Sequence, residues 1–566
     1  MLAGMHYKSL FPPVPPLPEQ NAHDFILDPM GQGHDIDHVL HVDASTGRKR
    51  TRREFKQRVR DAATALVSPP SDGGFGIGID QGEIIGILSH NCLEYITLVY
   101  SSLATTIPFA LISAYSTPFE LVHSLRVAKA TRLFVHPSLL SGALRAAREI
   151  GLSEEHIYIL EGHVKDRRSL GEAIEEVRRR QIPRVPVKPA RRDTLAYLVF
   201  SSGTSGLPKA VMISHGNIIY SLVQTIISAK DDPVPDGPPN VVLAFLPFYH
   251  TYGLHYLCLR GMLAPATFVV VSKWDVDAVL SLIPKFRITV LPLIPSAIHQ
   301  IVNHKRIRKV DFSSVTTIGS GAAYLPPQLA AALQSLVPSN PRIGEGYGMS
   351  ELTISAMRTP TPTMLGGRIE AKVGSCGLLL PGMEARIVRA DGSLAGLNEP
   401  GELWLKGGNV ALGYWGNEKA TKETFVDGWL RTGDTVRADE DQVFFFDTLK
   451  VSGVQVSPTE LEDLLIAHPD KLIIDACVAG VSGGRTSDEK VPRAWVVLSE
   501  RGKRRGDAAV IKALTAWSQQ NLSKYKWLRG GLQIVDQIPK NPTGKVLRRV
   551  LQDRYEESHS SSRAKL

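Results

Sequence analysis

Apolar residues form two kinds of pattern along the chain, a helical period and short continuous runs. After Thr51 they recur at every third or fourth position, which predicts an amphipathic helix, and a second helix is predicted over Cys92–Leu103. Short apolar runs, the length of buried strands, separate such segments at Glu83–Leu88, Arg132–Val135, Ile157–Leu160, Val241–Leu246, Thr267–Val271 and Thr289–Leu291. Strands that alternate with helices predict a parallel, doubly wound α/β architecture.

The last hundred residues carry a smaller set of elements. The pattern predicts helices over 458–467 and 507–522, and strands over 475–481, 494–498 and 532–535. A chain of 566 residues is too long for one ordinary hydrophobic core, so these elements indicate a second, small α/β domain. Residues 1–35 are rich in Pro, Gly and His and predict an extended arm on a domain surface.

Composition narrows the class of protein. A formal net charge of +9 is spread over short basic clusters without interleaved aromatic residues, which argues against nucleic acid and suits small polyanions such as ATP and CoA. No apolar run is long enough to span a membrane, and the N-terminus has no secretory pattern. No CxxC spacing is present, so neither a disulfide framework nor a metal site is predicted from Cys92, Cys258, Cys376 and Cys477.

A loop rich in hydroxyls and glycine follows the apolar strand Leu195–Phe200. It consists of Ser201, Ser202, Gly203, Thr204, Ser205, Gly206, Leu207, Pro208 and Lys209. Glycines let backbone N–H groups surround an anion, and the lysine adds positive charge, so the loop suits a phosphate. A Ser/Gly linker would need neither the lysine nor apolar flanks on both sides. The spacing differs from the Walker pattern.

The loop SSGTSGLPK resembles the phosphate loop of adenylate-forming enzymes, which include acyl-CoA synthetases, coumarate–CoA ligases, luciferases and peptide-synthetase adenylation domains. A second stretch, EGYGMSE, resembles the family pattern GYGxTE with serine in the threonine position. The resemblance implies that Tyr347 contacts adenine, that Ser350 contacts the α-phosphate and that Glu351 binds Mg²⁺. It extends the nucleotide site to Glu345, Gly346, Gly348 and Met349.

Other family motifs follow in the expected order, from about residue 50 to residue 550. The resemblance implies that Asp434, in GWLRTGD, accepts the ribose hydroxyls, although an aspartate after Gly433 also suits a turn cap. His250 comes directly after a buried strand and by itself suits a satisfied polar group. In the family this region faces the acyl substrate, which implies a pocket formed by His250, Tyr252, Gly321, Ala322 and Ala323.

The hinge departs from the family pattern. The family has Asp-Arg-x-Lys a few residues before a glycine, whereas here Asp447 is followed by TLKVSG, about four residues short and without the arginine. The shortening is either a true divergence or an error in the gene sequence. Around it, the resemblance implies that CoA contacts Lys450, Ser452 and Gly453. Lys545, in PKNPTGK, matches the family lysine that bridges carboxylate and ATP, so Lys545 and Lys209 are the expected catalytic residues.

The resemblance implies a fold and a function. We expect an arm (1–50), an adenylation domain of stacked mixed sheets with helices (51–447), a small mobile lid domain (448–555) and a disordered polar tail (556–566). The expected activity is an ATP-, Mg²⁺- and CoA-dependent ligase that converts an apolar carboxylic acid to an acyl-adenylate and then an acyl-CoA. Two alternatives remain: an adenylating enzyme with another acceptor or luciferase-like oxidation, and a hinge-impaired nucleotide-binding protein.

The C-terminal residues Ala564, Lys565 and Leu566 predict a peroxisomal address. A small, a basic and a leucine residue at a free carboxyl end fit the import pattern whose best-known form is SKL, which a receptor reads at the terminal carboxylate. An N-terminal fluorescent fusion should therefore appear punctate in cells. Deletion of the three residues should leave it cytoplasmic, and diffuse fluorescence from the intact fusion would contradict the prediction.

Overall fold

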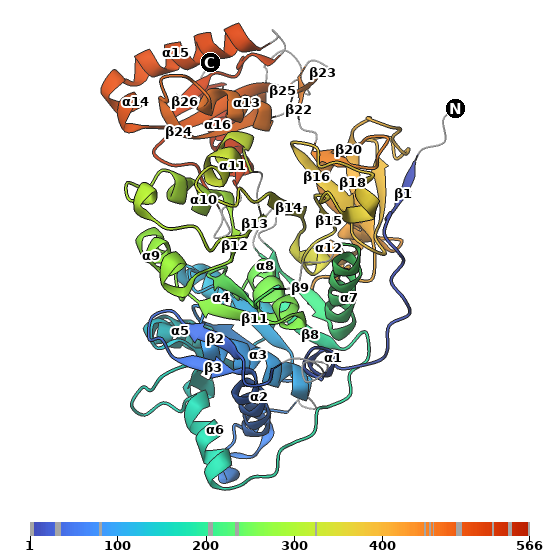
Figure 1. Cartoon of the computed structure of the whole chain (residues 1–566), viewed down its shortest axis with the longest axis vertical. Helices are drawn as coiled ribbons and strands as arrows, with labels where there is room; N and C mark the ends of the chain where they lie inside the picture. Colours follow the sequence, from blue (N-terminus) through green and yellow to red (C-terminus); the bar gives the residue numbers. More distant parts are fainter. Residues whose placement is uncertain are drawn as a thin grey trace.

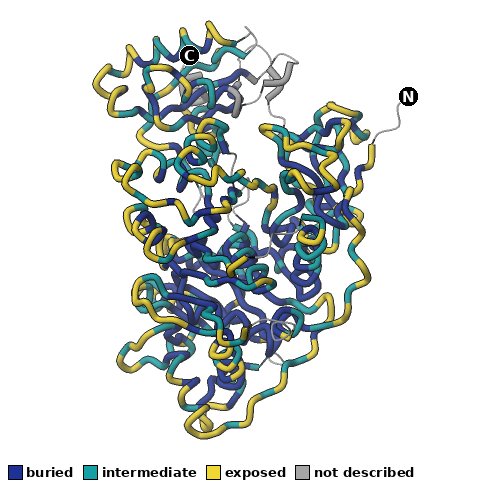
Figure 2. The backbone as a smooth tube through the Cα atoms, viewed as in Figure 1, coloured by how far each residue is buried: buried dark blue, intermediate teal, exposed yellow. Residues whose placement is uncertain are grey.

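The computed structural model of the chain describes residues 5–28, 35–78, 82–201, 208–232, 237–322, 325–446, 449–451, 454–456, 458–482, 490–522, 526–540 and 546–563. Figure 1 shows a long molecule in which the C-terminal unit, in orange and red, lies at one end. The buried residues form dark bands through the sheets and the helices packed on them, and exposed residues follow the outer loops and helix faces (Figure 2).

One sheet has the strand order β7-β6-β4-β5-β8-β9. Its strands are β4 (Ile85–Leu88), β5 (Phe109–Ile112), β6 (Arg132–Val135), β7 (Ile157–Ile159), β8 (Leu195–Ser201) and β9 (Lys209–Ser214). All neighbours are parallel except β8 and β9, which form an antiparallel pair with Ser201 opposite Lys209. The predicted phosphate loop therefore closes a hairpin at the edge of a parallel sheet.

A second, longer sheet runs β1-β17-β18-β20-β21-β16-β15-β14-β13-β12-β10-β11-β2-β3, with β19 beside β20. Its parallel part holds β2 (Val39–Asp43), β10 (Asn240–Ala244), β11 (Ala266–Val270), β12 (Val290–Leu293), β13 (Thr317–Ser320) and β14 (Ile343–Tyr347). Its antiparallel part holds β1 (His6–Lys8), β3 (Lys49–Thr51), β15 (Met357–Arg358), β16 (Ser375–Leu379), β17 (Glu384–Val388), β18 (Gly401–Lys406), β19 (Phe425–Val426), β20 (Trp429–Ala438) and β21 (Phe444–Phe446).

Helices cover these sheets. They are α1 (Ala22–Leu27), α2 (Arg52–Val67), α3 (Leu93–Thr105), α4 (Pro118–Ala128), α5 (Leu140–Ile150), α6 (Leu170–Arg179), α7 (His215–Asp231), α8 (Thr251–Gly253), α9 (Val276–Phe286), α10 (Pro295–Val302), α11 (Pro327–Gln334) and α12 (Glu418–Thr424). A π-helical turn, Leu254–Leu259, and a 3-10 turn, Arg260–Leu263, continue α8. Helix α2 begins with a capping box, because Thr51 and Glu54 each accept the other's backbone N–H.

The C-terminal unit begins with the hairpin β22 (Leu449–Val451) and β23 (Val454–Val456). Its sheet has the order β24-β25-β26 and is covered by helices. These elements are α13 (Pro458–Ile466), β24 (Ile473–Ser482), β25 (Lys490–Leu498), α14 (Glu500–Arg505), α15 (Asp507–Asn521), β26 (Leu532–Ile534) and α16 (Arg548–Arg563). The unit has its own apolar cluster, centred on Leu461, Val478, Val496, Val510 and Leu514.

The predicted α/β fold class is confirmed, and so are the predicted helices and strands, whose ends shift by a few residues. The four cysteines are free and buried. Within the described residues, no helix is long and apolar enough to cross a membrane.

Two expectations about the chain ends need correction. Residues 1–35 are not extended throughout, because α1 lies within them, and within the predicted arm 1–50 the strand β2 and the start of β3 belong to the long sheet. The polar tail from residue 556 was expected to be disordered, yet α16 continues to Arg563. Glutamate and arginine favour helix, and the buried Leu551 anchors the first part of α16, so the helix extends past the apolar pattern. Residues 564–566 lie outside the described residues.

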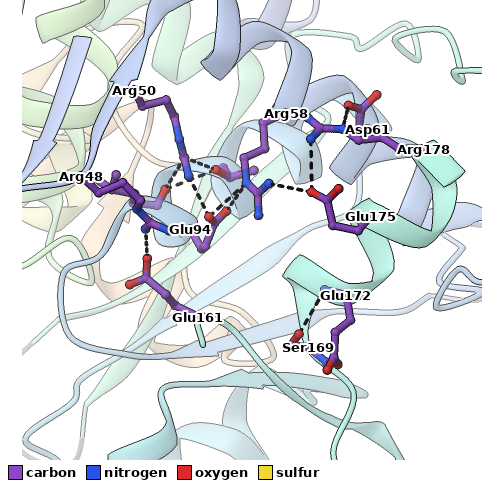
Figure 3. A network of polar contacts seen from close by, with 12 residues as sticks. Arg48, Arg50, Arg58, Asp61, Glu94, Glu161, Ser169, Glu172, Glu175 and Arg178 are labelled. Carbon is purple, nitrogen blue, oxygen red and sulfur yellow. Dashed lines mark hydrogen bonds and ion pairs between the residues drawn. The ribbon is translucent and has the colours of Figure 1, made fainter. Parts of the chain in front are cut away.

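A buried ion network fixes α2 against α3 (Figure 3). Glu94 on α3 is 3% exposed and pairs with Arg50 at 2.7 Å and with Arg58 at 2.9 Å. Burial alone would raise the pKa of Glu94, but the two guanidinium groups more than offset it, so the pKa is lowered. Further pairs extend the network, namely Arg48–Glu161, Arg58–Glu175 and Arg178–Asp61.

Loss of the Glu94 charge should strongly destabilise the protein. In Glu94→Gln the buried Arg50 would lose its charge partner, at a cost of about 3–5 kcal/mol. The control Glu418→Gln removes a pair with Lys422 that is 3.7 Å long and exposed, which should cost about 0.5 kcal/mol or less. Calorimetric unfolding of both variants measures the difference. Equal, small shifts would show that the network contributes little.

Candidate functional site

A cavity of about 2650 Å³ lies between the large body and the C-terminal unit. Its walls include the ends of β13 and β14, the segment from His250 to Arg260, and residues of the C-terminal unit such as Ile474 and Lys540. His299 on α10 and Ile474 of the C-terminal unit both line the cavity, and the Ile474 backbone acts on the His299 ring, so the two units meet beside it. A site built here draws side chains from both parts of the chain.

Tyr347 and Asp434 meet at one wall of this cavity. The Tyr347 hydroxyl donates to Asp434 Oδ2 at 2.7 Å, and burial together with the carboxylate raises the pKa of Tyr347. A Cβ on Gly348 would lie 1.7 Å from the carbonyl oxygen of Ile354, so only glycine fits behind the ring. The structure thus brings the residues expected at adenine and ribose within hydrogen-bond distance of each other.

Other members of the predicted nucleotide motif surround this pair. Glu345, Gly346 and Met349 line the same cavity, while Ser350 is buried at the start of a 3-10 turn, Ser350–Leu352. Burial raises the pKa of Glu345 to about 7. The carboxyl group is therefore readily protonated near neutral pH and can then donate a hydrogen bond, which suits a contact with a base.

Glu351 and Lys209 meet through Tyr414, a residue of the later family motifs for which the sequence predicts no role in the site. The Tyr414 hydroxyl donates to Glu351 Oε1 at 2.8 Å, and Lys209 Nζ lies 4.9 Å from the centre of the Tyr414 ring. Burial and the Glu351 carboxylate raise the pKa of Tyr414, so its hydroxyl keeps the proton that it donates. One tyrosine therefore connects the phosphate hairpin to the expected metal ligand.

The Glu351 carboxylate fits a Mg²⁺ ion that is held mainly by a nucleotide. It is 4% exposed, and among the described residues no basic side chain pairs with it. The described residues also contain no cluster of three or more metal-ligating side chains. Mg²⁺ typically takes one or two carboxylates and completes its shell with phosphates and water, which a single glutamate beside a phosphate loop allows.

The beginning of the phosphate loop is described and its centre is not. Ser201 is buried, and its Oγ has no hydrogen-bond partner among the described atoms. A buried hydroxyl without a partner is suited to bind a ligand atom. The remaining loop predictions lie outside the described residues: Ser202, Gly203, Thr204, Ser205 and Gly206. The same holds for Ala323, Ser452, Gly453 and Lys545.

The predicted acyl pocket forms another part of the wall. Burial lowers the pKa of His250 to about 4, so its imidazole is neutral, and Nδ1 accepts from the backbone of Tyr252. A Cβ on Gly321 would lie 3.3 Å from the Tyr252 ring, so the missing side chain makes room for that ring as well as for a ligand. Ala322 lines the cavity with φ of 69°, an unusual angle for alanine that is often found at functional turns.

Two asparagines that the sequence did not reveal hold these walls in place. Asn91 donates to the carbonyl of Leu246 and accepts from the backbone of Phe248, which fixes the segment before His250. Asn409 is fully buried and donates to the carbonyls of Leu352 and Ser355 on either side of a strained residue, Thr353. The sequence could have indicated these roles only by position, since Asn91 follows a strand and Asn409 lies in the stretch GGNV. Such positions also fit an asparagine in an ordinary turn.

At the hinge, Lys450 lies in β22 opposite Gln455 in β23. The hairpin follows β21, the last described strand of the large body, and leads directly into α13. Its position at the junction agrees with a pivot between the units, and contact between Lys450 and CoA stays a prediction.

A phosphate hairpin linked through Tyr414 to a buried glutamate, together with a Tyr–Asp pair on the cavity wall, is the arrangement of a nucleotide-binding enzyme with two α/β units. The sequence matches the AMP-binding enzyme family over residues 31–415 and the AMP-binding enzyme C-terminal domain over residues 460–545. The chain therefore belongs to the AMP-binding enzyme family, the adenylate-forming superfamily that its motifs resemble.

Curated relatives of similar length support this membership. A probable CoA ligase of Humulus lupulus is 32% identical over 91% of this chain and 89% of its own length. A 4-coumarate–CoA ligase of Narcissus pseudonarcissus is 30% identical over 84% and 85%. Among solved structures, an anthranilate CoA ligase in complex with anthranoyl-AMP has a TM-score of 0.80 at 24% identity and covers 96% of this chain and 99% of its own. That structure supports the fold alone.

Removal of the Tyr414 hydroxyl should weaken the response to Mg²⁺. Tyr414→Phe keeps the ring beside Lys209 but leaves Glu351 Oε1 without its donor, and such supporting contacts are typically worth about 10- to 100-fold in metal affinity. The half-saturating Mg²⁺ concentration for pyrophosphate release should rise accordingly. Tyr220→Phe, which loses a similar bond to the carbonyl of Gly382, is the control. An unchanged half-saturating Mg²⁺ concentration in Tyr414→Phe would contradict the prediction that Glu351 binds the metal.

Proposed function

We propose that the protein is an ATP-dependent acyl- or aryl-CoA ligase, an acid–thiol ligase that forms AMP. One observation carries the proposal: Lys209, Tyr414 and Glu351 form a connected group, and Glu351 follows two residues after Met349 on the cavity wall where Tyr347 pairs with Asp434. The relatives named CoA ligases agree with it. In this proposal a carboxylate attacks the α-phosphate of ATP to give an acyl-adenylate and pyrophosphate, and the CoA thiol then displaces AMP.

Each group has a task that its surroundings allow. Lys209 and the backbone of the loop 201–209 offset negative charge on the phosphate oxygens, which grows as the carboxylate attacks. Mg²⁺, when bound, supplies further positive charge to the same oxygens. Tyr414 holds Glu351 in place for the ion. Tyr347 and Asp434 position the nucleoside, since Asp434 Oδ1 stays available to a ribose hydroxyl while Oδ2 accepts from Tyr347.

The substrate is a carboxylic acid with a largely apolar body. Tyr252, Gly321 and Ala322 line its part of the cavity, and the neutral His250 adds no charge there. Contact with such walls contributes about 0.8 kcal/mol per buried methylene, so affinity should rise with chain length up to a limit.

A pyrophosphate-release assay over a panel of acids tests the proposal. Release with an acid and ATP, followed by an acyl-CoA product only when CoA is added, is the expected result. Release without any thioester would favour an adenylating enzyme with another acceptor. Nucleotide binding without release would favour a non-catalytic protein, in line with the shortened hinge after Asp447.

Lys545 should matter for the first half-reaction more than for the second. Lys545→Ala should lower acyl-adenylate formation by about 10²–10³-fold, the loss typical of a group that stabilises transition-state charge. Thioester formation from supplied acyl-AMP should survive better. Lys503→Ala, which removes an exposed lysine from α14, is the control. Equal losses in both half-reactions would contradict the proposed role of Lys545.

The peroxisomal address at residues 564–566 stays a separate prediction.

A further inference from the structure

An arginine lies in the wall of the proposed acyl pocket. Tyr252, Tyr256 and Arg260 follow one another at intervals of four residues along α8 and the turns that continue it, and all three line the cavity. The Tyr252 and Tyr256 rings pack edge to face with centres 5.8 Å apart. Since Tyr252 contacts the Gly321 position, the row leads from the predicted acyl site towards Arg260.

The Arg260 guanidinium group in the cavity wall has few hydrogen-bond partners and no acidic partner among the described residues. Its Nη2 donates to Ser355 Oγ at 3.1 Å, while its Nε is buried without a hydrogen-bond partner in the described structure. No carboxylate of the described residues forms an ion pair with it or acts on its charge. Burial lowers the pKa of Arg260 to about 10, so the group still carries its charge at neutral pH.

The neighbouring Arg358 shows the contrast. It also lines the cavity, but it pairs with Asp232 at 3.6 Å and feels the charge of Asp231 as well. Asp231 and Asp232 therefore balance Arg358, and Arg260 is left as an uncompensated positive charge in a largely apolar wall. A charge held in a pocket wall without a counter-charge is costly, so its presence indicates that a ligand supplies the partner.

We propose that Arg260 binds an anionic group, most simply a second carboxylate, at the end of the substrate remote from the reacting carboxylate. The inference rests on the proposed ligase function and narrows its substrate to acids with an apolar middle and two charged ends. The guanidinium fork suits a carboxylate, because two parallel N–H groups match its two oxygens. Tyr252 and Tyr256 flank the middle of such a molecule, and Arg260 ends the row.

A purely structural role explains less. A single bond to Ser355 would position that serine, yet a neutral donor could make it without the cost of a charge that has no counter-charge. The reacting carboxylate does not need Arg260 either, since the proposed function places other groups, such as Lys209, at the α-phosphate.

Matched pairs of acids test the proposal in the intact protein. Straight-chain dicarboxylic acids from malonate to suberate are compared with monocarboxylic acids of equal length, and terephthalate with p-toluate, by pyrophosphate release. The wild type should favour the dicarboxylic member at one length. In Arg260→Met the ratio of kcat/KM values, dicarboxylic over monocarboxylic, should fall about 10- to 100-fold, mainly through KM. Arg260→Lys should lie between, and the exposed Arg308→Met should keep the wild-type ratio.

A second measurement does not depend on turnover. The preferred dicarboxylic acid, added with AMP, should raise the Tm of the wild type and of Arg308→Met but not that of Arg260→Met. A wild type that prefers monocarboxylic acids at every length, or a ratio that Arg260→Met leaves unchanged, would overturn the inference while the ligase function stands. If no acid releases pyrophosphate, the ligase function fails, and the Tm shift still decides whether Arg260 binds the second carboxylate.

Discussion

The site depends on the hydrogen bonds that hold the segment 408–415 between two parts of the large body. On one side its backbone pairs with β9, through Leu412 and Trp415, and the Asn217 side chain donates to two of its carbonyls. On the other side Ala411 donates to the carbonyl of Glu351. The segment thereby fixes the distance between the phosphate hairpin and the glutamate, and Tyr414 fills the space between them.

This arrangement explains why an unfavourable backbone is kept beside Glu351. Thr353 has φ of 64°, which is costly for a β-branched residue. Its hydroxyl donates to the carbonyl of Asn409, whose side chain in turn binds the backbone on both sides of Thr353. The same clamp that holds the strained turn also holds Ser355, the partner of Arg260. The turn that carries Glu351 and the serine that contacts Arg260 are thus held by the same buried asparagine.

Much of the fold could be predicted because local pattern and final structure agree. β6 and the helices α3, α13 and α15 begin and end close to the predicted positions, since their apolar periods match the faces that they bury. The sequence predictions are wrong where the contacts that bury a segment leave no apolar pattern in that segment. The sequence predicts β2 and β3 as part of an arm, whereas β2 pairs with β11, which lies far along the chain, and β3 pairs with β2. α16 continues through a polar stretch that has no apolar period of its own.

The sequence by itself determined the residue types of the site and its family, because glycines, hydroxyls, a lysine and acidic groups at fixed spacing can only serve a limited chemistry. Tertiary structure decided which of them touch. Tyr414 reaches Glu351 across 63 residues, Tyr347 reaches Asp434 across 87 and Arg260 reaches Ser355 across 95. Whether an arginine finds a counter-charge depends on which strands and turns fold beside it, and local sequence carries no signal for contacts at that separation.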